Sequence, residues 1–404
     1  ALVLLMTIPG LALFYAGMVR KKNILATMMQ SFFICAMVTV LWMVLGYSLA
    51  FTDGNGFIGG LSRVFLNGLG ADWDKPFTLN AGTANALPMT IPESVFVMFQ
   101  MAFAIITPAV VTGAFVDRMK FSALTLFMAL WSLAVYAPVA HWVWSQTGWL
   151  NLLGVADFAG GTVVEINAGV AGLVCALVLG RRLGYGQENM APHNLAYAVT
   201  GAGLLWVGWL GFNSGGALGA GGRTGMAVLA TQVAAGGATL AWSFAEWVLH
   251  EKPSVLGAIS GAISGLVAIT PAAGFVLPGP ALAIGIVAGV VCFYAVTVLK
   301  PRLGYDDSLD AFGVHGIGGI VGTLLTGVFA FGPLSATSML PTGVFVGGAH
   351  LLGVQAIGVA ASLSYSGAVT WAVLKVTDLL VGLRVSREEE REGLDIVLHG
   401  EQVF

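Results

Sequence analysis

Long apolar segments, separated by short polar stretches, follow one another along almost the whole chain. Most of them are about as long as the twenty or so residues that an α-helix needs to cross a bilayer. Because apolar residues are not restricted to every second position, the pattern excludes a transmembrane β-barrel. It predicts an all-α polytopic membrane protein with eleven transmembrane helices, at residues 1–19, 24–51, 91–116, 121–141, 161–180, 193–213, 225–249, 255–275, 279–299, 311–331 and 344–381.

The eleventh segment is much longer than a perpendicular span requires. We expect it to form a strongly tilted helix or one that extends into the cytoplasm. The residues after it are rich in charge, with the run Arg-Glu-Glu-Glu-Arg-Glu at 387–392. The sequence therefore predicts a membrane domain over residues 1–383 and a soluble cytoplasmic tail over residues 384–404.

Composition agrees with this membrane class, since 57% of residues are hydrophobic and 9% are charged, against about 25% charged in soluble domains. The net charge of −3 argues against a nucleic-acid partner. Cys35, Cys175 and Cys292 lie in apolar stretches without metal-ligand spacing, so we expect packing roles and neither a metal nor a cofactor. The chain begins at Ala1 inside an apolar segment, and we expect a preceding segment to have been cleaved or left out.

Most basic residues lie in the short loops that follow the odd-numbered segments and in the C-terminal part of the chain. These regions hold 14 of the 17 Lys and Arg residues, whereas Arg63, Lys75 and Arg223 lie on the other side. Cytoplasmic loops are enriched in Lys and Arg. We therefore expect a plasma-membrane protein with its N-terminus outside and its C-terminus in the cytoplasm.

Two ionisable residues, Glu165 and His315, lie at matched positions in two apolar segments. Each follows an aspartate, Asp157 or Asp307, by eight residues, and the two copies are offset by 150 residues. A charge at the bilayer centre costs about 2.5–3.5 kcal/mol on insertion scales, so such groups often mark an ion or proton pathway. The alternative is a pair of polar groups that satisfy each other or the backbone.

The matched positions indicate an internal repeat of five segments, residues 1–182 against 193–331, with residues 344–383 as an additional helix. Residues 106–109 and 269–272 both read Ile-Thr-Pro-Ala, which supports the repeat. Because five is odd, the second half enters the membrane in the opposite sense. In such folds the substrate path lies between the halves near the midplane. We therefore expect Glu165 and His315 to meet there.

Aromatic residues are frequent along the expected path. Phe99 and Phe103 are four residues apart and share a helix face. Trp209 and Phe212 are three apart on another helix, and Trp144 follows the outer end of the fourth segment. Phe99 and Trp144 would suit a small cation, which aromatic faces attract by about 0.5–2 kcal/mol. The alternative is an ordinary aromatic belt at the membrane interface.

Several runs are similar to the signature motifs of the ammonium transporter (Amt/Mep/Rh) family. The sequence Thr-Ile-Pro-Gly-Leu-Ala-Leu-Phe-Tyr-Ala-Gly at 7–17 is one of them, and Phe-Gly-Val-His-Gly at 312–316 is another. The resemblance extends from residue 1 to about residue 400. On these motifs the chain is identified as a member of the Amt branch, and the other matching runs lie at 157–174, 180–182, 192–194, 208–213 and 391–395.

The resemblance implies a homotrimer with one pore per subunit, surrounded by membrane lipid. It implies ammonium or ammonia as the substrate and a cytoplasmic PII-type protein as regulator. It also implies a role for each candidate residue by position: recruitment at an outer site for Phe99 and Trp144, a structural acid near that site for Asp157, a gate of two stacked rings for Phe103 and Phe212, pore lining for Trp209, and the second of two pore histidines for His315.

Two positions depart from the common family pattern. Glu165 stands where the first pore histidine is usual, so a carboxylate and an imidazole would share the proton relay. Gly216 stands at the outer site where many relatives have a serine, so one hydrogen-bonding hydroxyl is missing. We expect this loss to lower the apparent affinity, since one hydrogen bond contributes about 0.5–1.5 kcal/mol net.

The residues and the resemblance together predict ammonium uptake. A full charge is costly to move through an apolar pore, so NH4⁺ would be recruited and deprotonated, and NH3 and the proton would cross separately. The second hypothesis is an ammonium sensor that binds but conducts little. A membrane-embedded enzyme is the weakest hypothesis, because neither a nucleophile–base pair nor metal-ligand spacing occurs in the sequence.

Overall fold

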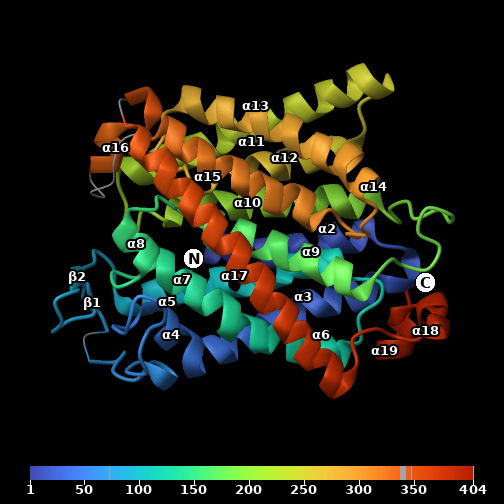
Figure 1. Cartoon of the computed structure of the whole chain (residues 1–404), viewed down its shortest axis with the longest axis horizontal. Helices are drawn as coiled ribbons and strands as arrows, with labels where there is room; N and C mark the ends of the chain where they lie inside the picture. The colour runs from blue at the N-terminus through green and yellow to red at the C-terminus, as the bar shows by residue number, and fades with distance from the viewer. Residues whose placement is uncertain (72, 337–342, 347, 404) are drawn as a thin grey trace.

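The computed structural model describes residues 1–71, 73–336, 343–346 and 348–403, and it is a bundle of long helices with similar or opposite directions (Figure 1). In this part of the chain, nine helices are long and apolar enough to cross a membrane. Two shorter apolar helices, Leu2–Met18 and Val255–Ile269, correspond to the remaining two predicted segments. The fold class predicted from the sequence is therefore confirmed.

The first half of the bundle contains the helices of the first five spans together with a short outer helix. They are α1 (Leu2–Leu5), α2 (Thr7–Met18), α3 (Ile24–Leu41), α4 (Tyr47–Phe51), α5 (Glu93–Val111), α6 (Phe121–Trp131), α7 (Ala137–Trp144), α8 (Trp149–Leu153) and α9 (Asn167–Leu179). The strands β1 (Thr78–Leu79) and β2 (Leu87–Pro88) form an antiparallel pair between α4 and α5. Short 3₁₀ turns occur at Lys21–Asn23, Val64–Leu66 and Thr112–Ala114.

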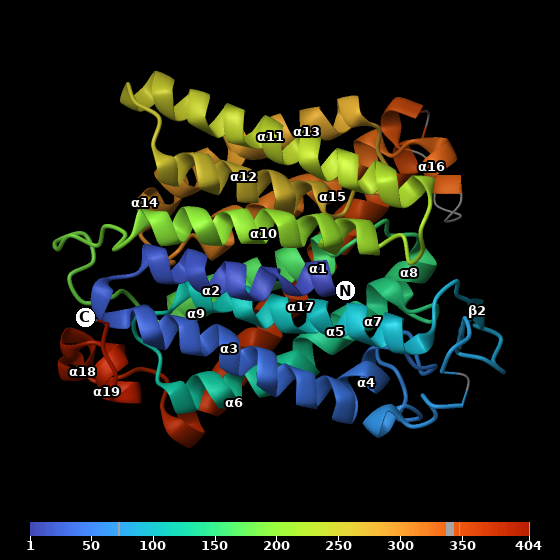
Figure 2. The ribbon, with the colours of Figure 1, turned by 180° about the vertical axis from the view of Figure 1, so that it is seen from behind.

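The second half and the C-terminal part continue the bundle. Their helices are α10 (Leu195–Gly215), α11 (Gly222–His250), α12 (Val255–Ile269), α13 (Pro278–Tyr294), α14 (Lys300–Leu303), α15 (Ile317–Phe329), α16 (Gly332–Ala336), α17 (Ala349–Val381), α18 (Arg387–Glu392) and α19 (Leu394–His399). Figure 2 shows α2 lying along α10, so the first helices of the two halves meet in the bundle. Gly10 and Gly201 allow this approach, because a Cβ on either would collide with the backbone of the other helix.

Within the described residues, five π-helical turns interrupt the spans, at Trp42–Gly46, Ser132–Tyr136, Gly161–Ile166, Ala295–Leu299 and Phe312–Gly316. Two of them, Ser132–Tyr136 and Ala295–Leu299, are 163 residues apart, the same offset as the two Ile-Thr-Pro-Ala runs. Another two, Gly161–Ile166 and Phe312–Gly316, contain Glu165 and His315. Single π-helical turns are frequent at functional sites, and here they follow the internal repeat.

The eleventh helix begins later than the sequence predicts. Helix α17 starts at Ala349, and Val344–Val346 forms a separate 3₁₀ turn before it. Residue 347 of the predicted segment, and Phe404 of the predicted tail, lie outside the described residues. With 33 residues, α17 is about 50 Å long and crosses the other helices obliquely (Figure 1). The prediction of a long, tilted helix is confirmed.

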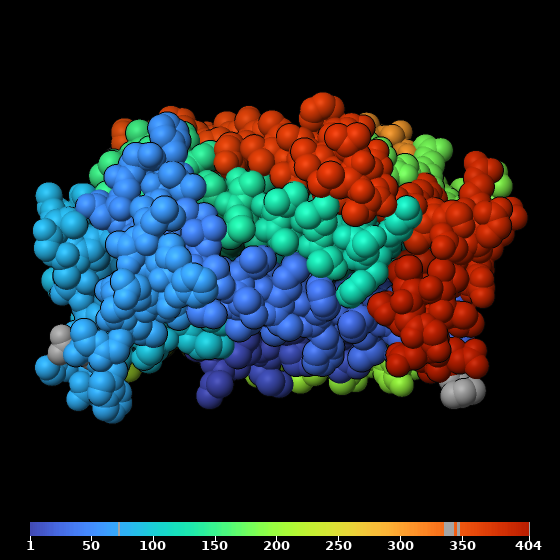
Figure 3. All heavy atoms as spheres, turned by 90° about the horizontal axis from the view of Figure 1, so that it is seen from below, coloured from blue at the N-terminus to red at the C-terminus, as the bar shows by residue number. Residues whose placement is uncertain are grey.

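The two ends of the bundle carry different structures. The segment between α4 and α5 lies at one end and the C-terminal tail at the other (Figure 3). The tail packs against the bundle through Asp395, whose Oδ1 accepts a hydrogen bond from the backbone N–H of Ala26 at 2.8 Å. Arg384 donates to the carbonyl oxygen of Leu179 at 2.8 Å. We call the end with the tail the tail end, and the opposite end the loop end.

Candidate functional site

Two aspartates start the π-helical turns that carry the ionisable pair. The carboxylate of Asp157 accepts hydrogen bonds from the backbone N–H groups of residues 160–162, each at 2.7 Å. That of Asp307 accepts from the N–H groups of residues 311–312, at 3.1 and 2.7 Å. Side-chain oxygens satisfy N–H groups that have no partner at a helix start. The equivalent aspartates therefore give the fifth and tenth spans the same local geometry.

Two glycines bring these spans into contact at equivalent places. A Cβ on Gly169 would collide with the backbone at Gly316, and a Cβ on Gly319 would lie 2.8 Å from the Cβ of Glu165. Each glycine thus faces the ionisable residue of the other half, or the residue beside it. Only a residue without a side chain permits such close packing of two helices. The site therefore lies where the two repeats cross.

Glu165 and His315 form a buried hydrogen-bonded pair at this crossing. The Oε2 atom of Glu165 lies 2.7 Å from Nδ1 of His315, and the two residues are 0% and 5% exposed. Oε1 of Glu165 is buried without a hydrogen-bond partner among the described residues. One proton between the two side chains is enough to make the bond, and the second oxygen stays free to accept another.

Four aromatic rings form a continuous line on one side of this pair, with three of them buried and Trp144 partly buried. The ring of Phe103 lies 5.3 Å from that of Trp144 and 4.5 Å from that of Phe212. Trp209 stacks on Phe212 at 4.9 Å and 20°, and its ring centroid is 6.3 Å from that of His315. The line therefore connects Trp144 to the ionisable pair.

The contact between Phe103 and Phe212 corrects one expectation. The rings come from the two halves and touch, but their planes are at 81°, so they meet edge to face and not as a parallel stack. Edge-to-face contact is a normal minimum for two quadrupolar rings. Phe103 also meets Phe99 edge-on at 4.7 Å. Phe103 therefore contacts both members of the predicted outer site.

The predicted outer site is held by backbone contacts. Nε1 of Trp144 donates to the carbonyl oxygen of Asp157 at 3.0 Å, which fixes the indole. Helix α7 extends through Trp144, three residues beyond the predicted end of that span. A Cβ on Gly216 would lie 2.5 Å from the carbonyl oxygen of Phe158. Gly216 is therefore the residue that lets the backbone of Phe158 pass close to α10.

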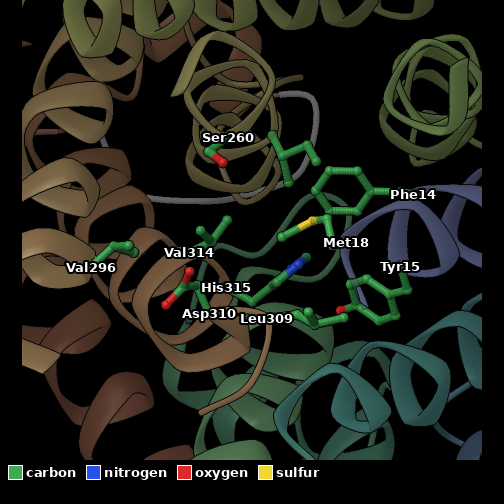
Figure 4. Close-up of a pocket in the computed structure, with 10 residues that line it drawn as sticks. Phe14, Tyr15, Met18, Ser260, Val296, Leu309, Asp310, Val314 and His315 are labelled. Carbon is green, nitrogen blue, oxygen red and sulfur yellow. The ribbon is translucent and has the colours of Figure 1, made fainter. Parts of the chain in front are cut away.

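On its other side, His315 points into a small cavity toward the tail end (Figure 4). The cavity has a volume of about 20 Å³, which is room for about one water molecule. Asp310 lines it, in a left-handed backbone conformation with φ of 62°, and pairs with Lys300 at 2.6 Å. Tyr15 also lines the cavity and donates to the carbonyl oxygen of Val110 at 3.0 Å.

Sequence reasoning did not identify three residues that complete this arrangement. Thr270 accepts the indole N–H of Trp209 at 2.8 Å and so orients that ring. Asp310 and Tyr15 line the cavity beside His315. The repeated Ile-Thr-Pro-Ala run contains Thr270, and Asp310 follows Asp307 by three residues, so both had a signal in the sequence. Tyr15 lies in the run at 7–17 that resembles a family motif, but the resemblance implied no role for this residue.

Comparisons with a family model and with known protein sequences all point to one family. The model of the Ammonium Transporter Family matches residues 1–404. A protein of Bacillus subtilis named ammonium transporter is 49% identical over 405 residues, which cover 100% of this chain and 96% of that one. A putative ammonium transporter of Methanothermobacter thermautotrophicus is 47% identical over 402 residues, with coverages of 99% and 95%.

Solved structures agree with the sequence comparison. Mep2 of Saccharomyces cerevisiae superposes with a TM-score of 0.86 and 35% identity, over 96% of this chain and 86% of that one. A structure described as a sensor Amt protein superposes with a TM-score of 0.88 and 28% identity, over 98% and 96% of the two chains. The fold is therefore shared by relatives that carry both kinds of name.

Proposed function

Because this chain belongs to the Ammonium Transporter Family, we propose that it takes up ammonium by recruiting NH4⁺, removing a proton, and conducting NH3 and the proton separately. One observation carries the proposal. The hydrogen bond of 2.7 Å between Glu165 and His315 lies at the end of a line of mostly buried aromatic rings. An apolar path that ends at a proton-exchanging pair suits a substrate that crosses as a neutral molecule.

Recruitment would take place at the loop end, where the faces of Phe99 and Trp144 flank Phe103. Aromatic faces attract a small cation by about 0.5–2 kcal/mol. Gly216 offers no hydroxyl there, so the apparent affinity is expected to be lower than in relatives with a serine. Phe103 and Phe212 fill the path beyond this point with apolar edges. A dehydrated ion is unfavourable between them, whereas NH3 passes without a charge.

The proton would move through Glu165 and His315. The free Oε1 of Glu165 is an acceptor for the next donor in a chain of water. The cavity beside His315 gives a water molecule a place on the side of the tail end. Net transfer of NH4⁺ is then electrogenic. Potassium has no proton to give up, so the same pair accounts for selectivity against it.

The basic loops support an orientation of the protein in the plasma membrane. The tail end carries most of the Lys and Arg residues, and cytoplasmic loops are enriched in these residues. We therefore assign the tail end to the cytoplasm, with the N-terminus outside. We propose a homotrimer from the family resemblance. We also propose a PII-type regulator that approaches the tail end, where the tail is anchored by Asp395 and Arg384.

The direct test is the substitution Glu165→Gln in reconstituted protein. Glutamine keeps the shape and polarity but does not exchange the proton, so we expect the ammonium-dependent current to fall on the order of a hundredfold, the low end of what a positioned proton-transfer group contributes. The thermal unfolding midpoint should stay close to that of the wild type. Glu401→Gln, at an exposed position, is the matched control and should leave the current unchanged. Undiminished current in Glu165→Gln would show that the relay assignment is wrong.

A second candidate function is an ammonium sensor that binds ammonium and conducts little. It is favoured by the superposition on a structure described as a sensor Amt protein and by the two unusual residues, Glu165 and Gly216. Current and binding measured on the same preparation distinguish the two functions. Saturable current that potassium does not carry supports uptake, whereas binding without current supports the sensor.

A further inference from the structure

Arg223, in the first turn of α11, lies against two aromatic rings at the loop end. Its guanidinium carbon is 5.1 Å from the ring centroid of Phe158 and 5.0 Å from that of Phe275. The two rings are themselves in edge-to-face contact at 5.3 Å. Nε of Arg223 donates to the carbonyl oxygen of Gly274 at 3.2 Å. The positive group is therefore held in a defined place and does not sample the solvent freely.

The charge of Arg223 has no acidic partner in the described part of the chain. No carboxylate there lies within ion-pair distance of its guanidinium group. Arg63, another basic residue of the loop end, differs because it pairs with Glu93 at 3.1 Å. Aromatic faces stabilise a cation without neutralising it. Among the described residues, the guanidinium group of Arg223 therefore belongs to no ion pair and keeps its positive charge at this end.

Phe158 connects Arg223 to the predicted recruitment site. The ring of Phe158 packs where a Cβ on Gly274 would be, and its carbonyl oxygen lies beside Gly216. The preceding residue, Asp157, holds the indole of Trp144. A single phenylalanine thus separates the guanidinium group from the place where an ammonium ion would be recruited. The guanidinium group of Arg223 would therefore repel a cation bound at that place.

We propose that Arg223 is a specificity-determining residue of the outer site, whose fixed positive charge lowers the occupancy of the site by cations. The inference rests on the proposed function, since it assigns a property to the same recruitment site. For two unit charges roughly 10 Å apart and an effective dielectric constant of about 25–80, the repulsion weakens binding of a monovalent cation about two- to tenfold. A divalent cation is repelled by the square of that factor. The site therefore favours singly charged ions.

The repulsion is measured with variants that separate charge from packing. Arg223→Met and Arg223→Gln remove the charge and keep an extended side chain against the two rings, whereas Arg223→Lys keeps the charge. Lys252→Met removes one positive charge after the other end of α11, which has 29 residues and is about 43 Å long. Figure 2 shows α11 running from the loop end to the tail end. Lys252→Met is therefore the matched control.

Equilibrium binding of methylammonium to the purified full-length protein is measured at about 10 mM and 1 M sodium chloride, where the screening length falls from about 30 to 3 Å. At low salt we expect Arg223→Met and Arg223→Gln to bind about two- to tenfold more tightly than the wild type. At high salt the difference should disappear. Arg223→Lys and Lys252→Met should bind like the wild type at both concentrations.

Two results would overturn the proposal. One is equal binding by the wild type and both neutral variants at low salt. The other is a difference that Arg223→Lys shares or that survives high salt, because that result indicates packing of Phe158 and not charge. Current measured on the same proteins separates this inference from the proposed function. A wild type that binds but carries no current ends the transport proposal, while the binding constants still decide the role of Arg223.

Discussion

At position 216 the chain has no side chain, and the backbone of Phe158 occupies the neighbouring space. Gly216→Ser would add the hydroxyl that the family resemblance implies at this position, but its Cβ would lie 2.5 Å from the carbonyl oxygen of Phe158. Overpacking of this kind costs about 1–3 kcal/mol. We therefore expect a lower thermal unfolding midpoint for Gly216→Ser. Considered alone, the added hydroxyl would predict only a gain in apparent ammonium affinity.

The control for this prediction lies in α10, the helix that Gly216 directly follows. A Cβ on Gly203 meets nothing within 4 Å, so Gly203→Ser tests the effect of a serine in α10 without a collision. We expect its unfolding midpoint to match or exceed that of the wild type. Equal midpoints for Gly216→Ser and Gly203→Ser would mean that Phe158 moves aside at no cost.

The proposed gate provides a second prediction at the residue scale. Phe103 contacts the rings of Phe99, Trp144 and Phe212, and its truncation to alanine leaves a cavity in the middle of the path. We expect Phe103→Ala to lose about 3–5 kcal/mol of stability, to admit water and to carry potassium current. Phe32→Ala, at a position that is 57% exposed, should change neither the stability nor the potassium current. A potassium-impermeable Phe103→Ala variant would argue against the gate.

At the scale of elements, the site depends on how closely the fifth and tenth spans approach. A Cβ on Gly319 would lie 2.8 Å from the Cβ of Glu165 and 3.0 Å from the backbone nitrogen of Ile166. Gly319→Ala must therefore push α15 away from the π-helical turn that holds Glu165. We expect a loss of about 1–3 kcal/mol and a lower ammonium current, because the contact between Glu165 and His315 lengthens.

A glycine in another span provides the comparison. Gly353 lies in α17, where a Cβ would meet nothing within 4 Å. Alanine has a higher helix propensity than glycine by about 1 kcal/mol, so Gly353→Ala should be as stable as the wild type or slightly more. Unfolding midpoints and currents of the two variants are measured side by side. If Gly319→Ala behaves like Gly353→Ala, close approach of the spans is not what positions the pair.

At the scale of the whole molecule, an ion-pair cluster joins the two halves at the tail end. Asp306 pairs with Arg182 at 2.7 Å and with Arg118 at 3.9 Å. Burial by itself would raise the pKa of Asp306, but hydrogen bonds from Arg182 and the charges of both arginines bring the pKa below its ordinary value. The folded protein therefore favours the ionised carboxylate.

The sign of the pH dependence follows from that lowered pKa. The stabilisation by Asp306 is complete above the unfolded-state pKa of about 3.9, and it is lost as the pH falls through the lower pKa of the folded state. Among the described residues, Asp306→Asn leaves the buried Arg118 without a carboxylate partner and Arg182 with Asp117 alone, and breaking a buried ion pair in this way costs about 3–5 kcal/mol. We expect the difference in unfolding midpoint from the wild type to be large at pH 6 and smaller at pH 3.

An exposed acid serves as the control for the cluster. Asp74 is exposed, and Asp74→Asn should follow the wild-type midpoint at both pH values. A difference between Asp306→Asn and the wild type that does not shrink on acidification would show that the shape of the side chain, and not its charge, matters at this position.

The sequence by itself determined the membrane class, the eleven spans and the repeat. Hydropathy suffices for the spans because the bilayer sets a minimum apolar length for each helix. The offset of 150 residues between Glu165 and His315 is enough to predict that the two side chains meet, since equivalent positions in an inverted repeat lie near the axis between the halves. The departures of Glu165 and Gly216 from the family pattern are predicted from the register of the surrounding motifs, and they stay predictions. The roles of these residues in transport stay predictions.

Tertiary structure decided what depends on several helices at once. The edge-to-face contact of Phe103 with Phe212 and the orientation of Trp209 by Thr270 are set by side-chain rotamers, which follow from packing and not from spacing along the chain. The start of α17 at Ala349 lies within an apolar stretch, where hydropathy contains no boundary. In the sequence, Arg223 is recognisable only as one basic residue on the outer side. Its aromatic contacts are with residues about 50 to 65 positions away. Such contacts are invisible in one sequence, because the chain brings them together only when the helices pack.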